Sequence, residues 1–353
     1  MIYFTPGPSQ LYPTVKKHMT SALRNEVPSL SHRSAKYQEI VSSTVVGLRT
    51  LLTIPKTHSI FFVASGTEAM ERIVENCVTK NSFHFINGAF SKRFFQTSIE
   101  LKKNAKKHEV AMGQGFDFEE QIIPKQTELV CFTQNETSTG VSLPMDKLYE
   151  LKKQNAKMLF VLDIVSSAPY VHVDFRSIDV AFFSVQKGFG LPAGLGVMIV
   201  GPDAIEKAEF LAKKGTNIGS YHNFLSLKTF ADKYQTPETP NVLGQYLLGK
   251  VIGDMLKKGM TNIRKETEEK AALLYRFFDR HNRYIPFVKE KMFRSKTVIT
   301  VVIPDGSKSV VQKLKERGFV VDRGYGELKE TQIRIANFPA TSKAAVNKLI
   351  ARM

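Results

Sequence analysis

The feature of this chain that most restricts its fold is a series of short, continuous apolar segments separated by stretches with helical spacing. The segments expected to form strands cover residues 59–64, 83–87, 129–133, 158–163, 179–184 and 196–200. Between them, residues 68–78, 90–103 and 145–154 have the period of amphipathic helices. Strands without alternating polar residues are buried on both faces, which is typical of a mostly parallel sheet covered by helices. This part of the sequence therefore predicts an α/β fold.

The pattern changes after residues 236–240, where Thr-Pro-Glu-Thr-Pro interrupts the alternation. One long helical stretch is expected from about residue 242 to 281. Further strands are expected at 297–303, 319–321 and 332–335, with helices at 308–317 and from 342. Two helices interleaved with three strands predict a second, smaller α+β domain. The length of 353 residues agrees with one large domain or two unequal ones.

The charge balance restricts the partners of the chain without choosing among them. Fifty Lys and Arg against thirty-three Asp and Glu leave a net charge of +17. Such an excess favours anionic partners: nucleic acid, an acidic membrane, or small carboxylate and phosphate substrates. The lysine pairs are scattered over several predicted helices and form no known nucleic-acid-binding pattern. A basic nucleic-acid-binding protein therefore remains a remote alternative, and no nucleic-acid partner is expected.

The cysteines and the chain start exclude several other classes of protein. Cys77 and Cys131 are the only cysteines and lie outside any CxxC motif, so neither a zinc site nor a disulfide framework is expected. The first residues lack the basic and apolar regions of a secretory signal. No apolar run approaches the ~20 residues needed to span a bilayer. We expect a cytoplasmic protein with no membrane partner and no metal.

Four polar motifs follow predicted strands, and ligands of α/β sheets bind at the carboxyl ends of strands. The motifs are Ser65–Thr67, Asn135–Gly140, Asp163 and Gln186–Lys187. A pyridoxal-phosphate enzyme needs a helix N-terminus for the phosphate, a lysine for the aldehyde and a carboxylate for the ring nitrogen. Each motif has an ordinary alternative: a solvated lysine, a turn-forming aspartate, a Ser-Gly-Thr loop. Their occurrence at successive strand ends favours the cofactor site.

These residues amount to a resemblance to a known family. The runs 163–167 and 179–200 resemble those of class V pyridoxal-phosphate-dependent aminotransferases, and 186–195 is most similar to the phosphoserine aminotransferase branch. Further segments agree in order along the chain: 5–8, 31–34, 65–69, 135–137, 235–239, 269–275 and 333–334. The resemblance implies the PLP-transferase type I fold, a mostly parallel sheet flanked by helices with a smaller α+β domain. It implies a large PLP-binding domain at 16–245 and a small domain at 1–15 and 246–353.

The resemblance also implies a pyridoxal 5'-phosphate site. In it, Lys187 bonds the cofactor and moves the proton between the substrate Cα and the cofactor, and Asp163 pairs with the pyridinium nitrogen. The remaining cofactor contacts that it implies are the phosphate ligands Gly66, Thr67 and Gln186, Thr137 near the ring oxygen, and Phe90 stacked on the ring.

Other residues are implied to bind substrate or a second subunit. Gln235 and Thr236 resemble the pair that reaches the cofactor phosphate of the neighbouring subunit, which implies a homodimer with shared active sites. Arg334 matches the arginine that binds the substrate α-carboxylate, a role that suits a planar guanidinium. His32 and Arg33 fall in a segment near the substrate entrance.

The reaction implied is ping-pong transamination between 3-phosphoserine and 2-oxoglutarate, a step of serine biosynthesis. The sequence departs from that branch at four places: it has no tryptophan to stack on the cofactor, Ser65–Ala69 replaces a Gly-rich loop, Gln235 replaces Asn, and no His-Arg pair precedes Arg334. The last departure keeps open transamination of serine or alanine with glyoxylate. A desulfurase-like lyase is a further alternative, but Cys77 and Cys131 are expected in the core.

Overall fold

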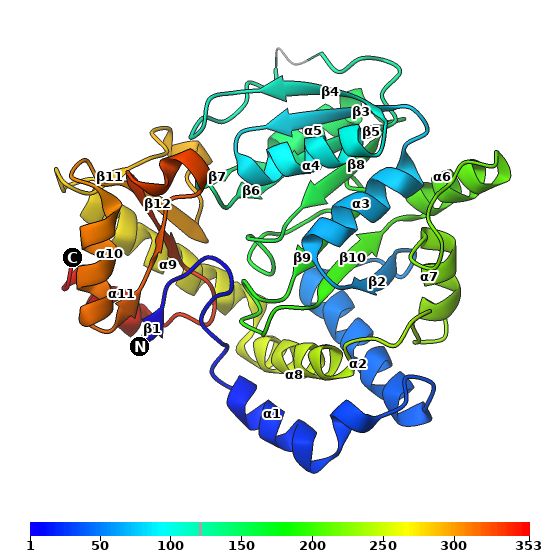
Figure 1. Cartoon of the computed structure of the whole chain (residues 1–353), viewed down its shortest axis with the longest axis horizontal. Helices are drawn as coiled ribbons and strands as arrows, with labels where there is room; N and C mark the ends of the chain where they lie inside the picture. The colour runs from blue at the N-terminus through cyan, green and yellow to red at the C-terminus, as the bar shows by residue number, and fades with distance from the viewer. Residues whose placement is uncertain (120–121) are drawn as a thin grey trace.

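The structure is a computed structural model that describes residues 1–119 and 122–353, and it consists of a large and a small unit, each built around its own sheet (Figure 1). The large unit contains α1 (Val15–Arg24), α2 (Ala35–Leu52), β2 (Ser59–Val63), α3 (Gly66–Cys77), β3 (Asn81–Ile86), α4 (Ala89–Glu100), β4 (Asn104–Glu109), β5 (Leu129–Thr133), β6 (Asn135–Glu136), β7 (Val141–Ser142), α5 (Met145–Gln154), β8 (Leu159–Asp163), β9 (Val180–Ser184), β10 (Gly196–Val200), α6 (Pro202–Lys213), α7 (Phe224–Ala231) and α8 (Val242–Lys258). The small unit contains β1 (Ile2–Tyr3), α9 (Met260–Phe278), β11 (Ile285–Pro286), β12 (Val298–Val302), α10 (Ser307–Glu316), β13 (Phe319–Val320), β14 (Asp322–Arg323), β15 (Gln332–Ala336) and α11 (Lys343–Ile350).

The sheet of the large unit has seven strands in the order β2-β10-β9-β8-β5-β3-β4. All neighbours pair in parallel except β10, which is antiparallel to both β2 and β9. The mostly parallel sheet predicted from the sequence is confirmed. Because β10 opposes both of its neighbours, β2 runs in the same direction as β9. The carboxyl ends of β2, β5, β8 and β9 therefore lie along one edge, which we call the carboxyl edge, opposite the amino edge.

Helices cover both faces of this sheet, which explains why its strands read as continuous apolar runs. In β2, Ile60 and Phe62 join the core shared with α2, α5 and α8, whereas Phe61 and Val63 join the core under α3, α6 and α7. Successive residues of a strand point to opposite faces, so both sets of side chains must be apolar when both faces are covered.

The small unit packs α9 and α11 against an antiparallel sheet of order β11-β12-β15-β14. Its core contains Leu274 and Phe278 from α9, together with Ile333 and Ile335 from β15. Arg334 stands between these two buried isoleucines, and the alternation of the strand turns it to the opposite face. The N-terminal β1 pairs in parallel with β13, so residues 2–3 lie beside a strand of the small unit.

The single long helix expected over residues 242–281 is two helices, α8 and α9. Gly259 separates them with φ +82, a conformation that glycine adopts without steric cost. Leu248, Val251 and Ile252 of α8 lie in the core of the large unit, beyond the predicted boundary at 245. We propose that the boundary between the two domains is at Gly259.

Helices α1, α2, α6 and α7 and strand β4 were not predicted from the sequence. Strand β4 is the edge strand of the large sheet and reads Asn-Ala-Lys-Lys-His-Glu, with most of its side chains outside the core. Charged residues on an edge strand prevent pairing with other chains, but they also remove the apolar signal of a strand. In residues 1–119 and 122–353, none of the helices has both the length and the apolar character needed to cross a membrane.

Candidate active site

Lys187 lies three residues after β9, at the carboxyl edge of the large sheet, with 7% of its surface exposed. Its Nζ donates a hydrogen bond to Thr137 Oγ1 at 3.0 Å and lies 5.1 Å from the centre of the Phe90 ring. The N-terminal segment covers its aliphatic stem so closely that a Cβ at Gly7 would approach Lys187 Cε to 2.9 Å. The structure therefore brings Lys187, Thr137 and Phe90 together around one buried amine.

Asp163 is the last residue of β8, the neighbour of β9, and it is 3% exposed. Its Oδ1 accepts a hydrogen bond from the Val165 N–H at 2.8 Å. Burial raises the pKa of the Asp163 carboxyl, although that hydrogen bond and the nearby Lys187 act to lower it. Burial lowers the pKa of the Lys187 amine, whereas Asp163 acts to raise it. Both groups are thus moved toward their neutral forms, which suits a lysine that reacts as a nucleophile.

The N-terminus of α3 is the element at this edge that can bind a phosphate. Ser65 caps the helix by accepting from the Glu68 N–H at 3.1 Å, and the Gly66 N–H donates to Ser184 Oγ at 2.8 Å. A Cβ at Gly66 would lie 2.9 Å from Val165 Cγ2, so only glycine allows α3 to begin this close to the loop after β8. Thr67 follows at the exposed start of the helix, where the backbone N–H groups and the helix dipole favour an anion.

Gln186 supplies an unused polar group beside Lys187. Its backbone carbonyl accepts from the Ser9 N–H at 2.9 Å. Its side-chain Oε1 is buried and has no hydrogen-bond partner among the described residues. The Gln186 amide can therefore still form hydrogen bonds with a molecule bound beside Lys187.

Arg334 approaches the site from the small unit. Its Nε donates to the Arg323 carbonyl at 2.9 Å, and its Nη2 lies 3.5 Å from Asp322 Oδ2. Burial lowers the pKa of the Arg334 guanidinium, and Asp322 acts to raise it. Even so, arginine stays charged in proteins.

The sequence analysis missed Tyr325, which connects Arg334 to Phe90. The Tyr325 ring lies 5.3 Å from the Phe90 ring and 5.4 Å from Arg334 Cζ. It stands between Gly324 and Gly326, and Gly326 has φ +56. An aromatic residue between two glycines shortly before Arg334 was the only signal in the sequence. Through this ring the small unit contacts the face of the candidate site on the large unit.

Gln235 and Thr236 lie in the loop between α7 and α8, where they contact Arg33, which precedes α2. The Arg33 guanidinium donates to Gln235 Oε1 at 3.0 Å and to the Thr236 carbonyl at 2.8 Å, and it lies over the Phe230 ring. His32 is partly exposed beside it. Arg33, Gln235 and Thr236 therefore form a second group, held together by hydrogen bonds of their own, and His32 adjoins it in the sequence.

His222, which the sequence analysis also missed, joins this second group to the start of α3. Its Nδ1 bonds Glu68, and its Nε2 forms an ion pair with Glu238 Oε2 at 3.1 Å. Burial favours the neutral imidazole, but Glu238 and Glu68 outweigh it and raise the pKa of His222 to about 9. Distant positions in the sequence supply the three side chains, so no local pattern could reveal them.

Cys77 and Cys131 lie in the core, as the sequence predicted. Burial raises the pKa of both thiols. A buried thiol with a raised pKa is a poor nucleophile, which argues against the lyase alternative.

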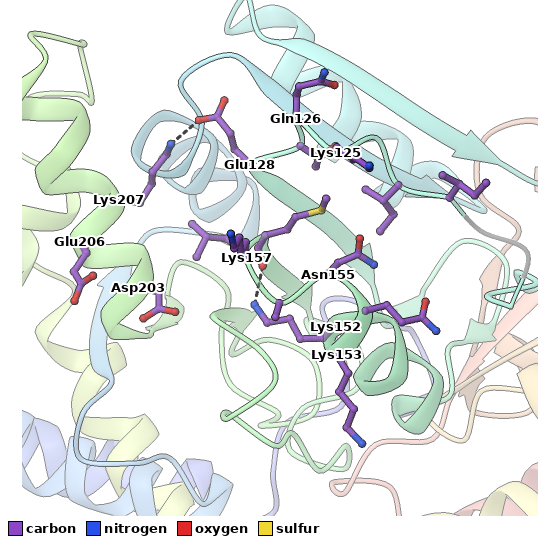
Figure 2. A pocket seen from close by; sticks show the side chains of 17 residues that line it. Lys125, Gln126, Glu128, Lys152, Lys153, Asn155, Lys157, Asp203, Glu206 and Lys207 are labelled. Atoms are coloured by element: carbon purple, nitrogen blue, oxygen red, sulfur yellow. Dashed lines mark hydrogen bonds and ion pairs between the residues drawn. The ribbon is translucent and has the colours of Figure 1, made fainter.

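A cavity of about 1090 Å³ lies away from this site, at the amino edge of the sheet (Figure 2). Residues just before or at the start of β5 and β8 line it, among them Glu128, Met158 and Leu159. Lys187 and Asp163 follow or end their strands at the other edge. The cavity is therefore separate from the candidate active site.

The chain is similar to known aminotransferases in both sequence and structure. The sequence profile described as aminotransferase class V matches residues 1–328, a range that ends just before Arg334. A phosphoserine aminotransferase of Rhodococcus opacus is 28% identical over 354 residues, which cover 98% of this chain and 92% of that protein. Among solved structures, a phosphoserine aminotransferase from Cytophaga hutchinsonii is 46% identical with a TM-score of 0.98, covering 99% of this chain and 97% of that one. An alanine–glyoxylate aminotransferase from a Nostoc species has a TM-score of 0.86 at 23% identity, covering 99% and 93%, which shows the shared fold alone.

Proposed function

The chain belongs to the class-V aminotransferases, and on that premise we propose that it transfers the amino group of 3-phosphoserine to 2-oxoglutarate, as a step of serine biosynthesis in the cytoplasm. The observation that carries the reaction type is the buried Lys187 amine, 3.0 Å from Thr137 Oγ1 and just after β9, the strand that pairs with the strand of Asp163. The choice of substrate is supported by the 46% identity to the Cytophaga hutchinsonii phosphoserine aminotransferase.

The residues of the carboxyl edge fit pyridoxal 5'-phosphate. At the start of α3, the backbone N–H and the hydroxyl of Thr67 can donate to its phosphate, and Gly66 lets the backbone come close, although the Gly66 N–H already donates to Ser184 Oγ. The Gln186 side chain can donate its amide N–H groups to the same phosphate. Thr137 can bond the ring oxygen, while the Phe90 ring can stack on one face of the pyridine. When bound, the cofactor supplies an aldehyde that accepts the amino group and a ring that withdraws electrons.

Two residues of this chain move or hold protons. The Lys187 amine, with its lowered pKa, would hold the cofactor and would carry the proton to and from the substrate Cα. The Asp163 carboxyl, whose burial raises its pKa, would hold a proton together with the ring nitrogen of the cofactor. Because both groups are almost fully buried, water does not compete for these protons.

Arg334 binds the substrate α-carboxylate in this proposal. The Arg323 carbonyl fixes its Nε, and Asp322 stands beside its Nη2, so the guanidinium fork has one orientation before substrate arrives. A fixed planar fork can bind a carboxylate through two parallel hydrogen bonds. The 2-oxo acid that accepts the amino group carries a carboxylate in the same position, so one arginine serves both half-reactions.

The proposal includes a homodimer with shared active sites. Gln235 and Thr236 are bound to Arg33 in a partly exposed loop. We propose that this loop reaches the cofactor phosphate of a second copy of the chain, with His32 and Arg33 at the substrate entrance. Sedimentation measurements on the purified protein test the dimer, and a monomer that retains full activity contradicts it.

A panel of amino donors tests the substrate. Each donor is mixed with cofactor-loaded protein, and the loss of the visible absorbance of the cofactor is followed over a single turnover. Serine is the matched control for 3-phosphoserine because it lacks only the phosphate. We expect fast conversion with 3-phosphoserine and slow conversion with serine and alanine.

The opposite ranking would favour transamination of serine or alanine with glyoxylate. One observation supports this alternative. The segment before Arg334 contains Arg323 and Tyr325 but no His-Arg pair, and the Arg323 guanidinium bonds Ser307 and Glu330. A colourless protein that binds arbitrary DNA in a salt-dependent manner would instead overturn the enzyme assignment.

A further inference from the structure

Glu136 is a fully buried carboxylate beside the candidate active site, with 0% of its surface exposed. It lies in β6, between Asn135 and Thr137, in the turn that follows β5. Taking a carboxylate out of water is costly unless hydrogen bonds replace the lost solvation. The hydrogen-bond partners of Glu136 therefore indicate its structural role.

Those partners are the first turn of α4 and the turn that contains Glu136 itself. Glu136 Oε1 accepts from the Phe90 N–H at 3.3 Å, and Oε2 accepts from the Ser91 N–H at 2.9 Å. The Ser138 hydroxyl donates to Oε1 at 2.6 Å and accepts from the Ala89 N–H at 2.9 Å. The first three N–H groups of α4 are thus all capped by residues 136 and 138.

The Glu136 carboxylate can approach the start of α4 because the residue at that point is a glycine. Its N-cap residue, Gly88, has no side chain that could cap the helix. A Cβ at Gly88 would lie 2.5 Å from both Glu136 Cγ and Ser138 Oγ, which is too close for any other residue. The capping function that Ser, Thr, Asp or Asn usually performs at this position comes instead from a distant turn.

This arrangement joins two groups that lie around the Lys187 amine. Phe90 is the second residue of α4, and its ring centre is 5.1 Å from Lys187 Nζ. Thr137 directly follows Glu136, and its Oγ1 is 3.0 Å from the same nitrogen. Because the carboxylate binds the backbone of Phe90 and is adjacent in sequence to Thr137, it fixes the position of one relative to the other.

We infer that Glu136 is a positioning residue of the aminotransferase: its carboxylate joins the start of α4 to the 135–140 turn and thereby holds Phe90 and Thr137 in place around Lys187. This inference rests on the proposed cofactor site and on no particular substrate. The charge of the carboxylate has a second effect, because Glu136 acts to raise the pKa of Lys187 and of Arg334.

The test compares Glu136→Gln with Glu128→Gln in the cofactor-loaded enzyme. Glu128 is the matched control because its carboxylate also accepts several backbone N–H bonds, but at the amino edge. The visible circular dichroism of the bound cofactor reports the orientation of its ring. Its absorbance, titrated against pH, reports the charge around the lysine that holds it.

We expect Glu136→Gln to reduce the visible circular dichroism at least twofold. It should also lower the pH midpoint of the absorbance change by about one unit, because a nearby negative charge is removed. Its kcat should fall about tenfold, with a smaller change in the KM of the amino donor. Glu128→Gln should change none of these. Equal spectra, midpoints and rates in the two variants would overturn the inference.

Glu136→Asp covers the case in which Glu136→Gln does not fold. The aspartate keeps the charge but is too short to reach both Phe90 and Ser91, so it should alter the circular dichroism and leave the pH midpoint near that of the wild type. Wild-type circular dichroism in Glu136→Asp would overturn the inference. If the wild-type protein binds no pyridoxal phosphate, the proposed function itself fails, and that result is visible before any variant is made.

Discussion

Lys187 and Asp163 at the carboxyl edge of the large sheet have few hydrogen-bond partners, whereas the charged side chains at its amino edge have several. At the carboxyl edge, the Lys187 amine has one hydroxyl partner at 3.0 Å, and the Asp163 carboxyl accepts one backbone N–H. At the amino edge, Glu128 accepts from three consecutive backbone N–H groups, those of residues 79, 80 and 81, and pairs with Lys207 at 2.5 Å (Figure 2). Near it, Lys152 bonds both Asp179 and the Met158 carbonyl at 2.7 Å.

The consequences for ionisation follow from the partners. Burial acts to raise the pKa of Glu128, but Lys207 and the backbone N–H groups outweigh it and lower the pKa to about 2. At the carboxyl edge burial dominates, so the pKa of Asp163 rises and that of Lys187 falls. The paired groups at the amino edge stay charged and unreactive, whereas Lys187 and Asp163 at the carboxyl edge are moved toward their neutral forms and can exchange protons.

The largest effect is expected for Lys187→Ala. Without the amine, covalent attachment of the cofactor and proton transfer at the substrate Cα both fail, so kcat should fall by on the order of 10⁴-fold, the upper end for one acid–base group. The visible absorbance of the holoenzyme should be lost with it. Lys153→Ala is the matched control, because this lysine is exposed at the amino edge and should leave kcat unchanged. A Lys187→Ala protein that retains covalently bound cofactor would contradict the assignment.

Asp163→Asn should be the next largest effect. Asparagine cannot hold the ring nitrogen in its protonated form, so kcat should fall by ~10²-fold, the range for loss of one electrostatic contact in a buried site. The free energy of unfolding of the cofactor-free protein should not decrease, because the substitution removes the cost of a buried acid. Urea unfolding of the cofactor-free variant measures this. A clear decrease in the free energy of unfolding would show that Asp163 is a structural group like Glu128.

The sequence was sufficient for the elements whose physical cause is local. Continuous apolar strands specify burial on both faces, so β2, β5 and β9 lie within a residue or two of their predicted ends. The polar strand ends predicted Lys187 and Asp163 as neighbours at one edge, because parallel strands align their carboxyl ends. The charged edge strand β4 had no such pattern, and the break at Gly259 could not be located because a single glycine within a helical period is often tolerated.

The parts of the site that depend on distant residues could not be predicted. Glu136 was adjacent to a predicted residue, but its role depends on the backbone of α4 and on Gly88, which are almost fifty positions earlier. Tyr325 and His222 likewise acquire their partners only when separate segments meet. A resemblance transfers the residues of a motif, whereas the contacts that orient them exist only in the fold.

Glu128→Gln tests the other side of the comparison and should affect stability alone. Glutamine keeps the size of the side chain but loses the charge that binds Lys207 and the three N–H groups, so unfolding should become easier by about 2 kcal/mol. The stabilisation from a carboxylate with a lowered pKa is present above pH ~4.5 and is lost as the pH falls toward 2. The wild type should therefore lose more stability over this interval than the variant, as urea unfolding at several pH values can measure. Parallel pH curves for the two proteins would show that the pairing contributes nothing.

The smallest effect is expected for His222→Gln, which tests whether the partners of a charged group or its edge of the sheet decide its contribution to stability. His222 is near the carboxyl edge, yet Glu68 and Glu238 pair with it and raise its pKa to about 9, against the effect of burial. A histidine with a raised pKa stabilises the fold fully below its ordinary value of about 6.5, and this contribution is lost as the pH rises through 9. Because the side chains of Glu68 and Glu238 are partly exposed, we expect the wild type to lose only about 1 kcal/mol more than His222→Gln over this interval. Glu238→Gln, which keeps one of the two carboxylates, should fall between them. If all three proteins respond equally to pH, ion pairing at the carboxyl edge does not stabilise the fold as it does at the amino edge, and the position of a charge rather than its partners decides the outcome.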